Sequence, residues 1–246
     1  MNNDVLELKK KFDLIKNKGW IKSERLGTTG IGYTFEKLIN KNEENFPVPD
    51  YGSIEIKTIR KFSKGKIHLF NSIPDGDSLF PIKRLLNIMG YPDKTNPEFK
   101  VFNISINACD FTSVGFHKRI KIFIDYVQEK IVLVGIDDNF NDLNLNISWS
   151  FDLLKDRLNT KLKYLALVDA SSKFINSIEY FYYNKIRFYK LKDFDTFISL
   201  ISNGLITITF KIGVFKSGKR YGQIHDRGTD FSINVNDLDK LYDFIS

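Results

Sequence analysis

The sequence has very little cysteine and no long apolar run. Its one cysteine, Cys109, excludes an internal disulfide and a cysteine-rich zinc site, and it fits a reducing compartment. Cys109 lies in an alternating apolar segment, so we expect a buried thiol. No stretch approaches the roughly 18 apolar residues that a membrane helix needs. The charged residues 1–16 do not have the pattern of a secretory signal. We therefore expect a cytoplasmic protein with no membrane contact.

Linkers and repeats are also absent. No Gly/Ser-rich or Pro-rich segment separates two parts of the chain, so the 246 residues should form one domain or two lobes packed together. A hydrophobic content of 42%, with 14% aromatic residues, is enough to bury a core. The net charge of +7 favours a polyanionic partner such as nucleic acid, although charge alone does not establish one.

The spacing of apolar residues predicts a mixture of helices and strands. Spacings of three and four predict an opening helix through Val5, Leu8, Phe12 and Ile15 that ends near Lys18-Gly19, and further helices at 33–41, 150–162 and 194–204. Alternation predicts strands at 53–60, 99–111, 163–170, 205–215 and 228–235, and a hairpin at 118–136. This order indicates an α/β or α+β fold around a central sheet. The chain becomes aromatic and basic after residue 172, so we expect a first lobe at 1–172 and a second lobe at 173–246.

Residues 49–57 read "PDYGSIEIK", in which Pro-Asp is followed after four residues by Glu-x-Lys. Metal-dependent nucleases of a large class space their active-site residues in this way. On the predicted strand Glu55 and Lys57 share one face, and Gly52 allows a tight turn that brings Asp50 beside Glu55. Two converging carboxylates suit Mg²⁺, with Mn²⁺ as a substitute, and Lys57 can orient or help to deprotonate a water. On spacing alone, an exposed Glu/Lys pair on an ordinary strand remains an alternative.

Residues 92–100, "PDKTNPEFK", fit the same spacing. Here Pro97 directly precedes Glu98, and proline cannot donate to a sheet ladder. We therefore expect Asp93, Glu98 and Lys100 to lie in a solvated loop and assign the catalytic role to the first match.

The window 211–227 holds five basic residues and one acid, interleaved with glycines. Such a segment can neutralise phosphates, while Lys, Arg, Gln or His can contact base edges. A solvated basic hairpin that binds nothing is the alternative. The candidate DNA-binding residues are Lys211, Lys216, Lys219, Arg220, Gln223, His225 and Arg227. His68 and His117 lie in no motif, so we expect them to be structural or exposed.

The segments "TGIGYTFEKLIN" and "PDYGSIEIKT" together resemble the restriction endonuclease family that includes MvaI and BcnI and is related to the mismatch-repair nicking enzyme MutH. "GVFKSGKRYGQIHDRGTDFSI" and "WSFDLLKDRLNTKLKYLALV" are similar to two further blocks of that family, so the resemblance covers about residues 19–235. The residues that match the first block are Gly30, Gly32, Glu36, Asp50, Glu55, Lys57 and Thr58.

The resemblance implies a two-lobed PD-(D/E)xK nuclease with a central mixed sheet flanked by helices, a catalytic first lobe and a DNA-recognition second lobe. It implies a monomeric, Mg²⁺-dependent type II restriction endonuclease that cuts double-stranded DNA one strand at a time. Glu36 would be an auxiliary acidic residue, and a companion DNA methyltransferase is expected as a genetic partner. A MutH-like nicking enzyme that needs an activating partner and a non-catalytic DNA-binding protein are the alternatives.

The chain departs from its CC-GG-reading relatives at three positions. Lys211 and Ser232 stand where those relatives have arginine, and Arg227 stands where they have a second histidine. We therefore expect a target sequence that differs from the CC-GG type at one or more positions.

Overall fold

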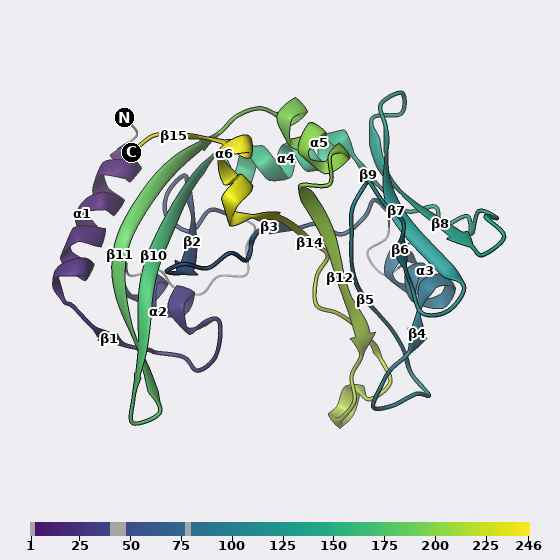
Figure 1. Ribbon diagram of the computed structural model, residues 1–246, viewed down its shortest axis with the longest axis horizontal. Coiled ribbons are helices and arrows are strands. Elements are labelled where there is room, and N and C mark those ends of the chain that lie inside the picture. Colours follow the sequence, from purple (N-terminus) through teal and green to yellow (C-terminus); the bar gives the residue numbers. More distant parts are fainter. Residues whose placement is uncertain (1–2, 40–47, 77–79) are drawn as a thin grey trace. The chain divides into compact units, whose positions relative to one another are not determined.

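The computed structural model describes residues 3–39, 48–76 and 80–246 (Figure 1). The chain divides into two compact units, each built from separate stretches of sequence. Unit 1 comprises Met1–Gly65, Leu158–Asp193 and Leu238–Ser246, and unit 2 comprises Lys66–Arg157 and Phe194–Asp237. No helix among the described residues is long and apolar enough to cross a membrane.

Unit 1 contains a mixed sheet in the order β1-β11-β10-β2, with β15 paired to β11. β2 runs parallel to β10, and the other pairs are antiparallel. Its elements are α1 (Asn3–Asn17), β1 (Ile21–Lys22), α2 (Gly30–Leu38), β2 (Ile54–Arg60), β10 (Tyr164–Ile175), β11 (Ile178–Leu191), α6 (Leu238–Leu241) and β15 (Tyr242–Phe244). The predicted mixed α+β fold is confirmed.

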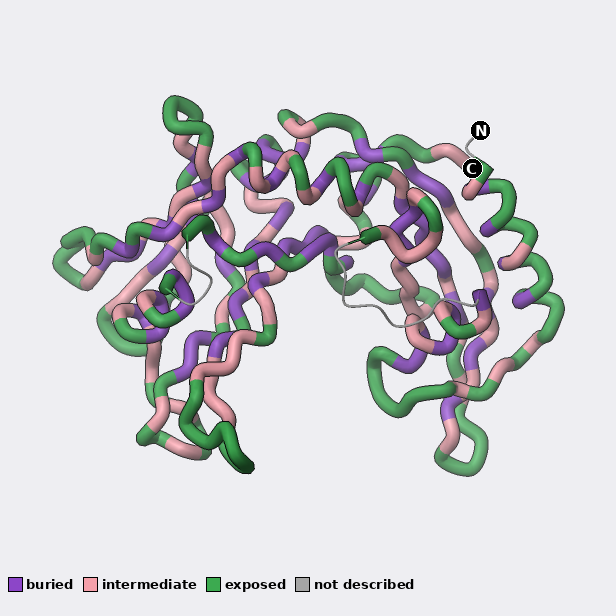
Figure 2. The backbone as a smooth tube through the Cα atoms, turned by 180° about the vertical axis from the view of Figure 1, so that it is seen from behind, coloured by how far each residue is buried: buried purple, intermediate pink, exposed green. Residues whose placement is uncertain are grey.

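Helices α1 and α2 pack on one face of this sheet. The α1 residues at spacings of three and four, Val5, Leu8, Phe12 and Ile15, are all buried, as their periodicity predicts. They form one core with apolar residues of α2, β2, β10 and β11. Buried and exposed residues alternate along the helix accordingly (Figure 2). The opposite face of β2 is therefore the one that can carry polar groups.

Unit 2 contains two antiparallel sheets. One has the order β3-β14-β12-β5-β4, with β13 paired to β12, and the other has the order β6-β7-β8-β9. The elements are β3 (Lys66–Asn71), α3 (Phe80–Met89), β4 (Tyr91–Pro92), β5 (Lys100–Ile106), β6 (Thr112–Ser113), β7 (Lys118–Asp125), β8 (Lys130–Asp137), β9 (Ser148–Ser150), α5 (Phe194–Ser202), β12 (Ile206–Val214), η1 (Gly218–Arg220), β13 (Ile224–Asp226), β14 (Asp230–Asn234) and η2 (Val235–Asp237). Helix α4 (Phe151–Lys161) begins in unit 2 and ends in unit 1.

The core of unit 2 is rich in aromatic residues. The rings of Phe70 and Phe231 stack with centroids 4.9 Å apart, and Trp149 meets Phe231 edge-on at 5.8 Å. The indole N–H of Trp149 donates to the Ser72 carbonyl at 3.0 Å, so the polar atom of this buried ring is satisfied. One face of the first sheet is thus apolar. Buried and more exposed residues alternate along β3 and β12, so the opposite face of the sheet is the polar one.

The two units do not follow the expected division at residue 172. The aromatic and basic segment after that residue is strand β11, which forms a long antiparallel hairpin with β10 and extends the sheet of unit 1. Strands β3 and β5, from the first half of the chain, pair instead with β14 and β12 in unit 2. Composition changes along the chain at residue 172, but hydrogen-bond pairing determines which strands fold together. Cys109 follows β5 and is exposed, so the expected burial of its thiol is wrong.

Candidate active site and nucleic-acid interface

A tight turn leads into strand β2 and sets the position of the first acidic motif. The backbones of Tyr51 and Ile54 exchange two hydrogen bonds, of 2.9 and 2.8 Å, across this turn. Gly52 has a φ of +55°, which a residue with a side chain rarely adopts. Asp4 of α1 accepts hydrogen bonds from the Ser53 N–H at 2.9 Å and the Ser53 hydroxyl at 2.7 Å. A Cβ atom on Gly52 would lie 2.6 Å from Asp4 Oδ2, so the turn requires glycine for two reasons.

The turn brings Asp50 back to the strand. Asp50 Oδ2 accepts a hydrogen bond of 2.8 Å from the Ile56 N–H. Lys57 Nζ lies 2.6 Å from Glu55 Oε1, so these two side chains share the face of β2 that α1 and α2 do not cover. Burial raises the pKa of Glu55, and the nearby negative charge of Asp50 raises it further. The structure therefore brings Asp50, Glu55 and Lys57 together, as the motif predicts.

Glu55 is more buried than an outward strand position suggests. Its relative exposure is 1%, and burial is the main cause of its raised pKa, with a further contribution from Asp50. Two lysines oppose this shift, because Lys57 and Lys161 lie 2.6 and 3.5 Å from the same oxygen, Oε1. The other oxygen, Oε2, is buried and has no hydrogen-bond partner. A buried carboxylate oxygen without a donor is a costly arrangement unless something else binds it.

Two residues at this site escaped sequence analysis. Lys161 ends helix α4, and Tyr242 begins β15. The Tyr242 hydroxyl is buried without a hydrogen-bond partner, and burial, together with the charge of Glu55, raises its pKa. Lys161 lies within the family-like block 149–168 but carries no predicted role there, and Tyr242 lies outside every quoted block. Finding them required knowing two strand pairings: β10, which follows Lys161, pairs in parallel with β2, and β15, which begins at Tyr242, pairs with β11.

Glu36 lies on α2, the helix that packs against the Ile54–Ile56 face of β2. The helix approaches the strand closely, since a Cβ atom on Gly32 would lie 3.2 Å from Thr58 Oγ1 and 3.7 Å from Glu36 Oε1. The charge of Glu36 also contributes to the raised pKa of Tyr183, after the larger effect of burial. Glu36 thus lies near Thr58, the residue after Lys57, and its auxiliary role stays a prediction.

The second acidic motif does not converge. Asp93 Oδ1 accepts from the Thr95 and Asn96 N–H groups and pairs with Lys216 Nζ at 2.7 Å. These bonds hold the pKa of Asp93 well below its usual range, the Lys216 contact being the largest cause. Glu98 instead accepts from the Asn96 side chain, and Lys100 donates to the backbone of α3. The three side chains make separate local contacts. Asp93 and Glu98 lie between β4 and β5, as expected for a loop, whereas Lys100 begins β5, so its predicted place in a loop is wrong.

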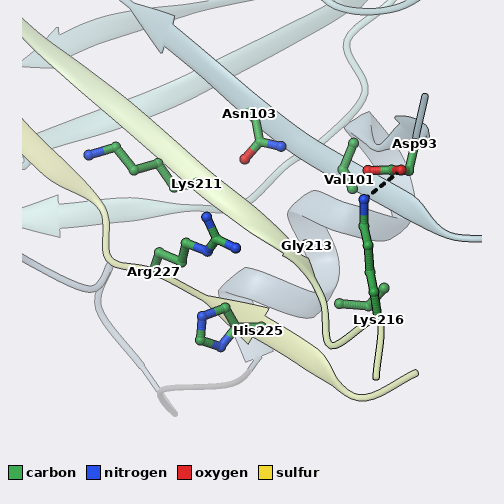
Figure 3. Close-up of a pocket in the computed structure, with 9 residues that line it drawn as sticks. Asp93, Val101, Asn103, Lys211, Gly213, Lys216, His225 and Arg227 are labelled. Atoms are coloured by element: carbon green, nitrogen blue, oxygen red, sulfur yellow. Dashed lines mark hydrogen bonds and ion pairs between the residues drawn. The ribbon is translucent and has the colours of Figure 1, made fainter. Parts of the chain in front are cut away.

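A pocket of about 430 Å³ in unit 2 collects four of the predicted DNA-binding residues (Figure 3). Lys211 comes from β12, His225 from β13 and Arg227 from the segment that follows β13; Lys216 lies just beyond β12. The Lys216 ammonium is already paired with Asp93, as the dashed line in Figure 3 marks. The His225 ring packs on Phe215 with centroids 4.3 Å apart. The pocket is therefore cationic and hydrogen-bonding, which suits an anionic, base-bearing ligand.

The other predicted DNA-binding residues do not line this pocket. Lys219 and Arg220 lie in the turn Gly218–Arg220, and both are exposed. The Arg220 guanidinium lies over the Phe215 ring at 3.9 Å. Gln223 is exposed, and its carbonyl accepts from the Phe215 N–H. These three side chains are exposed outside the pocket, and their contact with DNA stays a prediction.

A metal ion at the first motif would find two carboxylates and few other protein ligands. Among the described residues no group of three or more His, Cys, Asp or Glu side chains is arranged to hold a metal. Mg²⁺ commonly binds through one or two carboxylates and fills its remaining positions with water and substrate phosphate. Asp50 and Glu55, with the partnerless Glu55 Oε2, match that donor set.

Comparison with known proteins gives one consistent relationship. The model of the MvaI/BcnI restriction endonuclease family matches residues 9–242. The structure of restriction endonuclease MvaI in complex with its cognate DNA substrate is similar over 100% of this chain and 98% of that one, with 31% identity and a TM-score of 0.89. The structure of MvaI without DNA has the same coverage, with 30% identity and a TM-score of 0.66. No curated protein sequence matches the chain.

Proposed function

The chain belongs to the MvaI/BcnI restriction endonuclease family and is a sequence-specific DNA endonuclease, and from this premise we propose that it is a Mg²⁺-dependent type II enzyme that acts as a monomer and cuts one strand at a time. Asp50, Glu55 and Lys57 form its catalytic centre, with Glu36 as an auxiliary acid. Unit 1 carries the chemistry, and unit 2 contributes the main sequence-reading surface.

The observation that carries this proposal is the buried Glu55 oxygen without a partner. Burial raises the pKa of Glu55, the charge of Asp50 raises it further, and the ion pairs of both lysines go to Oε1. Oε2 is left buried without a donor, in a setting where a bound cation would remove the cost of burial. Asp50 and Glu55 would hold Mg²⁺, with Mn²⁺ as a substitute. The bound ion would acidify a water and stabilise charge on the scissile phosphate.

The chain's own residues have distinct tasks. Lys57 Nζ orients the attacking water or takes part in its deprotonation, and it remains close to Glu55 in the structure at 2.6 Å. Lys161 contacts the same carboxylate oxygen from α4 and keeps Glu55 in one orientation. Asp50 is held against the strand by the hydrogen bond that its Oδ2 accepts from the Ile56 N–H. The carboxylates and lysines are thus preorganised by backbone and by each other.

Double-stranded DNA is the partner, and we propose that the cationic pocket of unit 2 faces its major groove. Lys211, His225 and Arg227 supply donors for base edges, and exposed Lys219 and Arg220 supply phosphate contacts. MvaI, the similar protein of known structure, was determined with its cognate DNA. The DNA methyltransferase that accompanies a restriction enzyme is expected as a genetic neighbour, with no physical contact implied.

Digestion of supercoiled plasmid by the purified protein tests the proposal. With Mg²⁺ and no partner protein, nicked circles should accumulate first and linear product should follow, because a monomer with one site cuts the strands in sequence. A chelator should stop both steps. Nicked product alone would favour a MutH-like enzyme that needs an activator. Binding without cleavage at any metal concentration would favour a non-catalytic DNA-binding protein.

A further inference from the structure

Three polar side chains in unit 2 meet across neighbouring strands. His68 of β3 contacts Asp230 Oδ1 through its Nδ1 atom, and Lys211 of β12 lies 3.3 Å from Asp230 Oδ2. Strand β14, which carries Asp230, lies between β3 and β12 in the sheet. One carboxylate therefore fixes both an imidazole and an ammonium group. We call His68, Asp230 and Lys211 the reading triad.

The reading triad lies on the polar face of the sheet. Residues of β3 alternate, with Ile67 and Leu69 buried and His68 exposed. Lys211 also lines the cationic pocket (Figure 3). The triad therefore adjoins the proposed DNA-binding surface. The side chain of Asp230 is only 13% exposed, whereas those of His68 and Lys211 are 43% and 48% exposed. The acid is thus recessed while its two partners project.

Stability alone gives little reason for this arrangement. Ion pairs with exposed partners contribute about 0–1 kcal/mol, and withdrawing a carboxylate from water carries a cost of its own. On a surface that approaches phosphates, an unpaired acid would also repel the ligand. His68 and Lys211, both paired with the recessed Asp230 carboxylate, reduce that repulsion. The same contacts restrict the conformations of these two outward-facing side chains.

Hydrogen-bond chemistry then determines what the projecting atoms can recognise. Asp230 Oδ1 is an acceptor, so the His68 Nδ1 atom carries the hydrogen in their contact and Nε2 is left for a ligand. In the major groove, Nε2 of a neutral ring accepts from the amino groups of cytosine and adenine, and Nε2 of a charged ring donates to base carbonyl oxygens and N7 atoms. Lys211 presents donors, which suit the O6 and N7 acceptors of guanine. Both kinds of base pair carry an amino donor and acceptors on this edge, and the order of these groups is what two fixed side chains can distinguish.

The adjoining polar side chains bond to one another. Lys66 Nζ donates to the Thr207 hydroxyl at 2.8 Å, and the Thr209 hydroxyl donates to Ser105 Oγ at 2.9 Å.

We propose that His68 is a specificity-determining residue that reads one base pair of the target together with Lys211, with Asp230 as the positioning residue that holds both. The inference rests on the proposed function, since it needs a sequence-specific nuclease. It assigns a role to a histidine that lies in no motif of the sequence.

Cleavage profiling of a DNA library with a randomised target region tests the proposal. The wild type, His68→Ala and Asp230→Ala are compared with His117→Ala as the matched control. His117 also pairs with an aspartate, Asp138, but both side chains are largely exposed on a different part of unit 2. Sequencing the cut ends gives the preference at every base pair of the target.

His68→Ala should lower discrimination at one base pair by about tenfold to a hundredfold and leave the other positions unchanged. Asp230→Ala should affect the same pair, and the double variant should lose little more, because both changes disrupt one contact. His117→Ala should retain the wild-type profile. Thermal unfolding of each variant establishes that it is folded.

Three results would overturn the inference. If wild type cuts specifically and His68→Ala has the wild-type profile, His68 does not read a base. If His68→Ala weakens cleavage equally for all sequences, the residue contacts the backbone. If the wild type cuts no DNA at all, the proposed function fails and this inference fails with it.

Discussion

The turn at Gly52 offers the sharpest test of how the fold positions the catalytic residues. Gly52→Ala forces an alanine into left-handed backbone at a φ of +55° and places its Cβ atom 2.6 Å from Asp4 Oδ2. The left-handed conformation costs about 1–2 kcal/mol. Displacing the Asp4 carboxylate also removes the two hydrogen bonds from Ser53, worth about 2–3 kcal/mol together at a partly exposed site. The expected loss of stability is about 3–5 kcal/mol, a large part of the stability of an ordinary domain.

A double-mutant cycle separates the two contributions. Asp4→Ala alone should cost about 2–3 kcal/mol, because it removes the same two bonds. In the Asp4→Ala background Gly52→Ala meets no carboxylate, so it should add only the backbone cost of about 1–2 kcal/mol. Urea denaturation of the four proteins gives the free energies of unfolding. If the cost of the double variant equals the sum of the two single costs to within about 0.5 kcal/mol, the claim that Asp4 and Gly52 interact directly is refuted.

Three further perturbations follow from the same geometry. Lys57→Ala should lower cleavage by about a hundredfold or more and leave DNA binding largely intact, whereas Lys100→Ala in the second motif should change neither; plasmid cleavage and gel-shift assays check this. Glu55→Gln should abolish cleavage and raise the stability of the metal-free protein at neutral pH. Burial raises the pKa of Glu55, so the ionised carboxylate destabilises the fold as the pH rises from the unfolded pKa through the folded one, and glutamine removes that charge. The gain in denaturation experiments should disappear below about pH 4, where the carboxyl is protonated in both states, and a loss at neutral pH would contradict it. Lys219→Ala should weaken DNA binding for all sequences alike and reduce the salt dependence by about one phosphate contact, which titrations at several salt concentrations measure.

Local patterns in the sequence predicted most of the elements. The stripe of Val5, Leu8, Phe12 and Ile15 identified α1, and the alternation around Ile54 and Ile56 identified β2. Short-range geometry also placed Asp50 beside Glu55, because the turn between them is local and Gly52 permits it. Features formed by residues within about ten positions of one another could therefore be predicted from the sequence.

The pairing of strands that lie far apart in the sequence could not be predicted. Composition after residue 172 suggested a new lobe, yet β11 returns along β10 in the same sheet, and β3 and β5 join strands from the far end of the chain. Lys161 and Tyr242 reach Glu55 only through that topology. The contact of His68 with Asp230 depends on the pairing of β3 with β14. The burial of Glu55, which gives the site its chemistry, is a consequence of the same packing.

The most direct measurement is digestion of a DNA of known sequence by wild type and by Lys57→Ala, with Mg²⁺ or with a chelator, followed by mapping of the cut ends. The account predicts cuts at one recurring sequence that require both Mg²⁺ and Lys57. Cuts at the same ends by Lys57→Ala, or by the wild type with the metal removed, would contradict it.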